Sequence, residues 1–201
     1  MIPALLTVAA YLLGAIPTSY LVARLRGIDL RQHGSGNLGA TNTYRVLGWR
    51  AATPVFIVDI LKGWFPTQFF SGWDGADLPE LALLYGAAAI VGHVFSVYVG
   101  FKGGKGVATS AGVLLALAPL AVVVGLVLWG SIVFFTGYVS LASIIAAVAV
   151  PPVILAVQGA RAVFWLSLGL AAFVVFAHRA NLRRLWRGEE HRFRRKAGSA
   201  S

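Results

Sequence analysis

The sequence contains no cysteine, one methionine and only seven acidic residues among 201. Without cysteine there can be no disulfide framework, no thiol nucleophile and no zinc–thiolate site. Three of the seven acids, Asp74, Asp77 and Glu80, lie in one short link, so no carboxylate cluster remains that is typical of a catalytic metal site. We therefore expect neither a metal nor a cofactor.

Charge of either sign is scarce and apolar residues dominate. The chain is 58% hydrophobic and 12% charged, whereas a soluble domain normally has about 25% charged residues. This composition predicts an all-α, polytopic membrane bundle whose main partner is the lipid bilayer. A net charge of +10 would suggest nucleic acid in a soluble protein. Here the basic residues flank apolar runs, and the positive-inside bias explains them without a nucleic acid.

Seven apolar segments are predicted within one membrane domain that covers residues 1–201. They are residues 2–23, 51–70, 81–101, 107–118, 120–135, 138–157 with a kink at Pro151–Pro152, and 162–177. The fourth is short, and it either crosses or re-enters from the same side. The first lacks a basic leader region, which favours a retained helix over a cleaved signal.

The distribution of basic residues predicts the orientation. Arg24, Arg26 and Arg31 follow the first segment, and Lys102 follows the third. This pattern places the N-terminus outside and the C-terminus in the cytoplasm. Residues 192–201 are expected to form a flexible basic tail.

The first of three polar islands covers residues 34–45. Its glycines formally match G-x-G-x-x-G, but no hydrophobic strand precedes them and there is no room for a βαβ unit. A glycine-rich turn before a helix can still seat a phosphate. The candidate ligands are Ser35, Gly36, Asn37, Thr41, Asn42 and the guanidinium of Arg45. The alternative is an ordinary interfacial turn with Ser35 or Thr41 as the helix cap.

The second island centres on residues 102–106, Lys-Gly-Gly-Lys-Gly, which we name the Lys–Gly loop. It is not a Walker A loop, because Val99 and Gly106 stand where glycine and Ser or Thr are required. Gly103, Gly104 and Gly106 allow a backbone that directs N–H groups toward an anion, and Lys102 and Lys105 add charge. The alternative, that the lysines only mark the cytoplasmic ends of two helices, does not explain three glycines.

The third island covers residues 178–190. If it is helical, His178 and Asn181 share one face with Leu182 and Leu185. The simpler interpretation is a basic amphipathic segment on anionic lipid, with Trp186 at the interface. A histidine and an asparagine next to a membrane segment are less easily explained as lipid contacts.

Three further polar residues interrupt apolar segments. Asp59 and Lys62 have the i, i+3 spacing of an ion pair that would be neutral in the bilayer, and a structural role is about as well supported as a functional one. His93 lies roughly two turns before the Lys–Gly loop, and a lone helix histidine is most often structural.

Together the islands closely resemble the bacterial acyl-phosphate-dependent glycerol-3-phosphate acyltransferase family. The matching residues are Ser35-Gly36-Asn37-Leu38-Gly39-Ala40-Thr41-Asn42 with Arg45, Gly92-His93, Phe101 through Thr109, His178-Arg179-x-Asn181-x-x-Arg184-Leu185 with Gly188-x-Glu190, and Asp59-x-x-Lys62-Gly63. Leu38 and Ser96 depart from the family pattern, in which proline is expected. Both departures should affect loop rigidity more than chemistry.

The resemblance implies an enzyme that transfers a fatty acyl group from acyl phosphate to the 1-hydroxyl of sn-glycerol 3-phosphate. The products would be 1-acyl-glycerol 3-phosphate and phosphate, in the first step of phospholipid synthesis. It implies a site on the cytoplasmic face of the bacterial inner membrane, and it is compatible with a soluble partner enzyme that makes acyl phosphate. An activated mixed anhydride needs no covalent nucleophile, in accord with the missing cysteine. Two anionic substrates suit the supply of Lys and Arg.

The resemblance also implies roles for individual residues. The catalytic set is Ser35, Arg45, Lys105, His178 and Asn181; the substrate-binding set is Gly36, Asn37, Thr41, Asn42, Lys102, Gly103, Gly104, Gly106, Arg179, Arg184 and Glu190; and Asp59, Lys62 and His93 would support them. Lys102, Lys105 and the amides of residues 103–106 would hold one phosphate. The base is open between His178, His93 and a substrate phosphate, of which the phosphate is slightly favoured.

Two other classes of function compete with this interpretation. An organophosphate transporter would place its binding residues at the midplane of repeated broken helices, but the polar residues here gather at one membrane face and no repeat is visible. A non-catalytic lipid-binding scaffold would predict that Lys105→Ala and Arg45→Ala leave acyl transfer unchanged.

Overall fold

The computed structural model describes residues 1–76, 78 and 80–193, and no strand occurs among them. The chain divides into two compact units, Met1–Pro119 and Leu120–Ser201. The all-α class predicted from composition is therefore confirmed.

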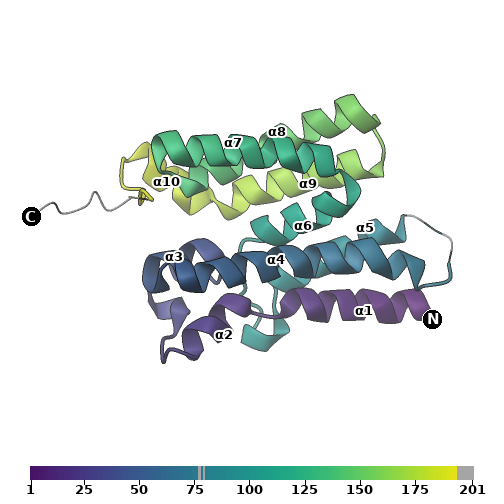
Figure 1. The fold of residues 1–201 in the computed structure, drawn as a ribbon, viewed down its shortest axis with the longest axis horizontal. Coiled ribbons are helices and arrows are strands. Elements are labelled where there is room, and N and C mark those ends of the chain that lie inside the picture. Colours follow the sequence, from purple (N-terminus) through teal and green to yellow (C-terminus); the bar gives the residue numbers. More distant parts are fainter. Residues whose placement is uncertain (77, 79, 194–201) are drawn as a thin grey trace, which may run out of the picture. The chain divides into compact units, whose positions relative to one another are not determined.

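The first unit is built on two helix pairs. Its elements are α1 (Ile2–Ala15), α2 (Thr18–Arg24), the 3-10 turn η1 (Leu30–Gln32), α3 (Ala40–Leu47), α4 (Trp49–Phe69), η2 (Phe70–Gly72), α5 (Leu81–Val94), η3 (Val97–Val99) and α6 (Val107–Leu117). Helix α1 packs on α5, and α4 packs on α6. Helices α2 and α3 lie at the end of the unit away from the N-terminus (Figure 1).

The predicted first segment is two helices, because α1 and α2 meet at an angle of 41°. Pro17 lies at the break and has no N–H to continue the helical ladder. Two side chains satisfy carbonyl groups at this point. Ser96 Oγ donates to Ala15 O at 2.5 Å, and Lys62 Nζ donates to Ile16 O at 2.9 Å. The break is therefore held by α4 and by the segment that follows α5.

Glycines allow the paired helices to approach closely. A side chain at Gly14 would collide with the carbonyl of Ala89 across the α1–α5 contact, and one at Gly112 would collide with the carbonyl of Ile60 across the α4–α6 contact. Small residues at helix contacts are typical of membrane bundles, where van der Waals packing replaces the hydrophobic effect between helices.

Gly112→Ala should therefore lower stability, by about 1–3 kcal/mol, because the new methyl group must push α4 away from α6. The measurement is thermal unfolding of the purified protein in detergent. Gly130→Ala is the matched control, since Gly130 is also helical and nothing lies within 4 Å of a Cβ built there. This control should raise stability by about 0.5–1 kcal/mol. Equal effects of both substitutions would contradict the close α4–α6 contact.

The second unit contains α7 (Pro119–Thr136), α8 (Val139–Gln158), α9 (Ala162–Ala177) and α10 (Arg179–Trp186). The predicted segments 120–135, 138–157 and 162–177 agree with α7, α8 and α9 to within one residue at each end. Helix α8 continues through Pro151 and Pro152. Helices α9 and α10 meet at 56°.

Within the described part of the chain, three helical segments are long and apolar enough to cross a membrane, or up to five if each bent pair counts as one span. Helix α6 is a separate short apolar helix of 11 residues. At 1.5 Å per residue it extends about 16 Å, roughly half of the hydrocarbon thickness. The predicted short fourth segment is thus a helix, and by itself it is too short to span.

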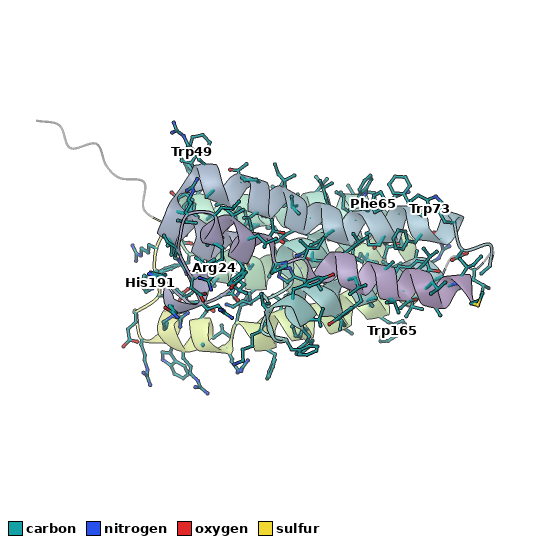
Figure 2. All side chains as sticks on the ribbon, turned by 90° about the horizontal axis from the view of Figure 1, so that it is seen from below. Arg24, Trp49, Phe65, Trp73, Trp165 and His191 are labelled. Carbon is teal, nitrogen blue, oxygen red and sulfur yellow. The ribbon has the colours of Figure 1, made fainter. Side chains whose placement is uncertain are left out.

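The first unit has two distinct ends. In the first unit Arg24 and Trp49 lie toward one end, and Phe65 and Trp73 lie toward the other (Figure 2). Phe65 and Trp73 belong to an aromatic cluster with ring centroids 5.9 Å apart. Aromatic residues concentrate at membrane–water interfaces.

Part of the predicted flexible tail is ordered. Arg192 Nε donates to the hydroxyl of Tyr138 at 2.9 Å, and the Phe193 N–H donates to Gly137 O at 2.6 Å. The remaining tail, residues 194–201, lies outside the described residues, as does Asp77 of the predicted outer link.

Candidate anion-binding site

Asn42 organises the first island from within. Its side chain is 1% exposed. Its Oδ1 accepts the Ser35 N–H at 2.8 Å, and its Nδ2 donates to His33 O at 3.0 Å and to Leu30 O at 3.3 Å. The amide therefore fixes the glycine turn, in which Gly34 and Gly36 have φ of 61° and 71°. Ser35 is exposed at the tip of this turn.

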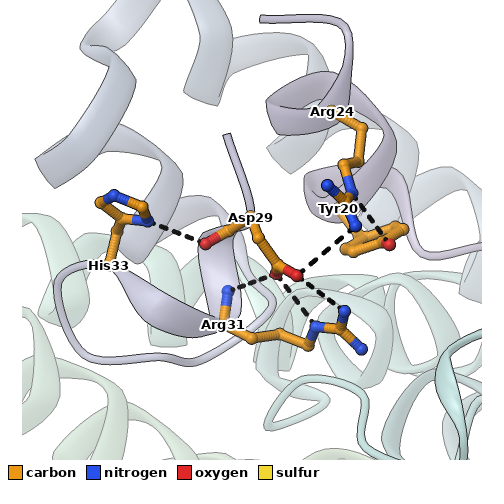
Figure 3. Close-up of polar contacts among 5 residues, drawn as sticks. All are labelled: Tyr20, Arg24, Asp29, Arg31 and His33. Atoms are coloured by element: carbon orange, nitrogen blue, oxygen red, sulfur yellow. Dashed lines mark hydrogen bonds and ion pairs between the residues drawn. The ribbon is translucent and has the colours of Figure 1, made fainter. Parts of the chain in front are cut away.

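A charged cluster fixes the segment that leads into this turn (Figure 3). Asp29 accepts from Arg31 through the backbone N–H, Nε and Nη2, at 3.1, 3.0 and 2.7 Å. Arg24 lies 3.6 Å from the same carboxylate, and the guanidinium groups of Arg24 and Arg31 lie 5.2 and 4.9 Å from the centre of the Tyr20 ring. The hydrogen bonds from Arg31 are the main reason that the pKa of Asp29 falls to about 2. The cluster therefore stays ionised at any physiological pH.

The Lys–Gly loop uses two of its own amides internally. The N–H groups of Gly103 and Gly104 donate to Val94 O at 3.0 Å and to His93 O at 3.1 Å. These bonds tie the loop to the end of α5. The sequence assigned both amides to a phosphate, whereas the structure shows them engaged in holding the loop.

The amides that start α6 are better placed for an anion. Gly106 has φ of 76° and is the residue before the first turn of α6. The first N–H groups of any helix have no partner within the helix, and the helix dipole favours negative charge there. Lys105 precedes this helix end directly and is half-buried, while Lys102 is exposed.

The first island and the Lys–Gly loop meet. A side chain at Gly104 would collide with the carbonyl of Leu38 and with Nε2 of His93. Only glycine allows this approach. On the other side of the first island, Thr41 and Arg45 are four residues apart on α3 and so share a face. The structure thus brings together two of the three islands that the sequence singled out.

A small pocket lies beside this contact. It is lined by Ile16, Pro17, Thr18, Ser19, Leu38, Asp59, Lys62, His93, Ser96, Gly103 and Gly104. Asp59 and Lys62 form the predicted pair, with Lys62 Nζ 2.8 Å from Asp59 Oδ1. His93 Nδ1 lies 3.8 Å from the same oxygen. All three side chains are at least nine-tenths buried.

The third island belongs to the second unit, and Glu190 is its centre. Its Oε1 accepts from Asn181 Nδ2 at 2.7 Å and from Ser140 Oγ at 2.9 Å, while Oε2 accepts from Arg184 Nε at 2.7 Å. Burial raises the pKa of Glu190, but these hydrogen bonds and the charge of Arg184 outweigh burial and hold the pKa below its ordinary 4.5. Glu190 and Arg184 thus position Asn181.

The hydrogen bond of His178 determines its tautomer. His178 is 4% exposed, and its Nδ1 lies 2.8 Å from Val174 O. A carbonyl oxygen can only accept, so Nδ1 must carry the proton, and in the neutral ring Nε2 then presents a lone pair. Arg179 points elsewhere, with its guanidinium 4.4 Å from the centre of the Phe176 ring and a bond to Phe176 O.

Sequence reasoning missed two residues that build these sites. Ser140 lies in the apolar helix α8, and nothing in its neighbours signals a partnership with Glu190 fifty residues later. In the sequence, Ser96 stands out only because the family pattern has proline there. In the structure its hydroxyl donates to Ala15 O. A hydroxyl within an otherwise apolar segment was the available signal in both cases.

These features define an integral membrane protein in which a half-buried lysine, Lys105, lies just before the start of helix α6. The model of the glycerol-3-phosphate acyltransferase family matches residues 4–188. Relatives of that name share 46% identity in Geobacter sulfurreducens and 40% in Aquifex aeolicus, each covering 94% of this chain and 97% of the relative. The chain therefore belongs to the glycerol-3-phosphate acyltransferase family.

Two solved structures are similar to this one throughout. Both are of PlsY, an integral membrane glycerol 3-phosphate acyltransferase. Its glycerol 3-phosphate form has a TM-score of 0.89 and 38% identity, with 96% of each chain covered. Its lysophosphatidic acid form has a TM-score of 0.85 and 37% identity, with 94% of each chain covered.

Proposed function

We propose that this protein transfers a fatty acyl group from acyl phosphate to the 1-hydroxyl of glycerol 3-phosphate, giving 1-acyl-glycerol 3-phosphate and inorganic phosphate. Acylation of glycerol 3-phosphate is supported by the family and by the PlsY structures. The observation that carries the proposal is the contact between Leu38 of the first island and Gly104 of the Lys–Gly loop, which supports a site shared by these two segments.

One phosphate is assigned to Lys105 and to the first amides of α6, with Lys102 as a more exposed contributor. The Gly103 and Gly104 N–H groups are already bonded within the loop, so the backbone donors proposed for this phosphate are the N–H groups of Gly106 and of the first residues of α6. Ser35, Thr41 and Arg45 on the facing turn and helix would hold the second phosphorylated substrate. Arginine suits that role because its fork can bind two phosphate oxygens at once.

His178 and Asn181 of the second unit are assigned catalytic roles as well, within one acyltransferase domain that covers residues 1–201. The family match supports this joint assignment, because it runs through both units. Glu190 and Arg184 act by holding Asn181, and Arg179 would bind substrate only by leaving Phe176. Gly36 and Asn37 remain assigned to substrate binding, on the turn that Asn42 fixes.

The reaction needs no covalent intermediate. The glycerol oxygen forms a bond to the acyl carbon, the bond from that carbon to the phosphate oxygen breaks, and phosphate leaves. Positioning and charge stabilisation then provide most of the rate enhancement. The hydroxyl proton passes to a substrate phosphate. His178 is the rival base, because its Nε2 lone pair suits this task. His93 is a weaker candidate, because its Nε2 lies against Gly104.

The proposed membrane arrangement has seven segments, with the N-terminus outside and the C-terminus in the cytoplasm of a bacterial inner membrane. Charge supports it. The end of the first unit marked by Arg24 carries the basic residues, and the end marked by Trp73 carries the acidic link. The site would then open to the cytoplasm, where glycerol 3-phosphate and a soluble source of acyl phosphate are found.

The test incubates purified protein with palmitoyl phosphate and glycerol 3-phosphate and follows both phosphate release and the lipid product. Palmitoyl-CoA is run in parallel as the donor. The proposal expects product from palmitoyl phosphate alone. Product from palmitoyl-CoA alone would reject the donor, and no product from either would reject the function.

Arg45→Lys should raise the KM for glycerol 3-phosphate by about tenfold, since lysine keeps the charge but loses the two-point contact. Arg50→Lys is the control, because Arg50 is exposed at the start of α4 and lies 5.6 Å from the Trp49 ring. Its KM should not change. An unchanged KM in Arg45→Lys would remove Arg45 from phosphate binding.

A further inference from the structure

A buried set of three ionisable side chains connects the broken first segment to the Lys–Gly loop. Lys62 Nζ bonds Asp59 at 2.8 Å and Ile16 O at 2.9 Å, so it joins α4 to the point where α1 ends. His93 on α5 turns Nδ1 toward Asp59 Oδ1, 3.8 Å away. The set belongs entirely to the first unit.

The opposite edge of the His93 ring, which carries Nε2, packs against the Lys–Gly loop. A side chain at Gly104 would collide with His93 Nε2, so the ring lies directly against this glycine. The backbone of the same histidine accepts the Gly104 N–H at 3.1 Å, and Val94 O accepts the Gly103 N–H at 3.0 Å. The position of the loop, and of Lys105 one residue later, therefore follows the position of His93.

The Asp59–Lys62 pair packs against the Nδ1 edge of His93 without a hydrogen bond, since Asp59 Oδ1 lies 3.8 Å away and Nδ1 has no hydrogen-bond partner among the described residues. Asp59 and Lys62 are buried and of opposite sign, so the pair is neutral overall, and neither can move to water without breaking its contacts. The pair presents one carboxylate oxygen to the Nδ1 side of the imidazole. The imidazole is thus confined between a fixed carboxylate and the Gly104 backbone.

We propose that His93, packed between the Asp59–Lys62 pair and Gly104, is a positioning residue that sets the location of Lys105 through Gly104. His93 acts on the substrate only through the loop. The kinetic part of this inference rests on the proposed function, whereas the structural part does not.

The first test measures hydrogen exchange of residues 100–106 by mass spectrometry, which requires no catalytic activity. His93→Ala should speed exchange of the Gly103 and Gly104 amides by about tenfold, because the support of their hydrogen bonds is lost. His93→Gln keeps a nitrogen near the position of Nε2, and exchange should return to within about threefold of the wild type. Tyr85→Phe is the matched control: Tyr85 is also on α5 and fully buried, but it bonds Asp74.

The second test is a double-mutant cycle with Lys105→Ala. His93→Ala alone should raise the KM for the phosphorylated substrate bound by Lys105 by about tenfold, with a smaller change in kcat. In the Lys105→Ala background the same substitution should change KM by less than about twofold, because its route to the substrate is gone. A residue that only stabilises the fold would give the same change in both backgrounds.

The outcomes separate this inference from the proposed function. Unchanged exchange in His93→Ala, equal exchange in His93→Ala and Tyr85→Phe, or additive KM effects would each overturn the positioning role. A wild-type protein that is inactive with both donors would reject the proposed function, and the exchange experiment would still decide the role of His93.

Discussion

Lys105→Ala is expected to lower kcat/KM by about 10²–10³-fold while leaving the folded protein intact. The reason is that Lys105 is half-buried and lies two residues before α6, where we propose that it and the first helix amides bind one phosphate. Removing one preorganised donor from such a seat typically costs this much in rate. The measurement is steady-state kinetics with palmitoyl phosphate and glycerol 3-phosphate, with thermal unfolding recorded for each variant.

Two variants control this experiment. Arg50→Ala removes the same charge from an exposed position and should leave kcat/KM within about twofold of the wild type. Lys105→Arg keeps the charge and should recover part of the activity, although guanidinium and ammonium groups differ in size and geometry. A Lys105→Ala protein as active as Arg50→Ala would mean that the lysine only determines topology.

The sequence located the Lys–Gly loop, but it could not show which of the loop's N–H groups form hydrogen bonds within the protein and which could bind a phosphate. Its three glycines have different tasks. Gly103 and Gly104 permit a close backbone approach to α5 and to Leu38, while Gly106 takes the left-handed backbone that begins α6. All three look equivalent in a linear sequence. Only the fold shows which N–H groups are already bonded.

Asn42 illustrates the same limit at the first island. The sequence counted it as a substrate ligand, and that role stays a prediction. In the structure its side chain forms hydrogen bonds with Ser35, His33 and Leu30. A side-chain amide that fixes a turn and one that binds a ligand require the same residue type at the same spacing, so spacing could not separate them.

The helical segments were more predictable, because long apolar runs and basic flanks mark them directly. The predicted residues 162–177 are those of α9. The first segment was the exception. The apolar run continues through Pro17, so hydropathy gave no sign of the break, and only the bonds from Ser96 and Lys62 reveal how the two carbonyls are satisfied. Those partners are 81 and 46 residues away in the chain, beyond the reach of local patterns.

Glu190→Ala should destabilise the protein by about 3 kcal/mol, because it leaves the buried donors of Asn181, Ser140 and Arg184 without their acceptor. Bonds to a charged group contribute about 1.5–3 kcal/mol each. The partial exposure of the Arg184 side chain, 34%, makes its share the smallest. Thermal unfolding in detergent should show a midpoint lower by roughly 6–12 °C. Activity should fall as well, because Asn181 loses its restraint.

The neighbouring residue provides a matched control for this experiment. Glu189 is exposed and carries the same charge, and a surface substitution of this kind usually changes stability by less than about 0.5 kcal/mol. Glu189→Ala should therefore unfold at nearly the wild-type temperature. If both alanine variants unfold alike, the Glu190 hydrogen bonds do not stabilise the second unit.

The ionisation of Glu190 adds a dependence on pH whose direction is determined by its pKa. Because the folded pKa lies below the ordinary 4.5, the stabilisation is fully present above about pH 5 and is lost as the pH falls through the folded value. Glu190→Gln cannot ionise, so its unfolding temperature should fall less between about pH 6 and pH 4 than that of the wild type. The same decrease in both proteins would show that other carboxylates cause the acid sensitivity. A smaller decrease in the variant would assign part of that sensitivity to the Glu190 network, and thereby show that the residue holding Asn181 is ionised in the folded protein.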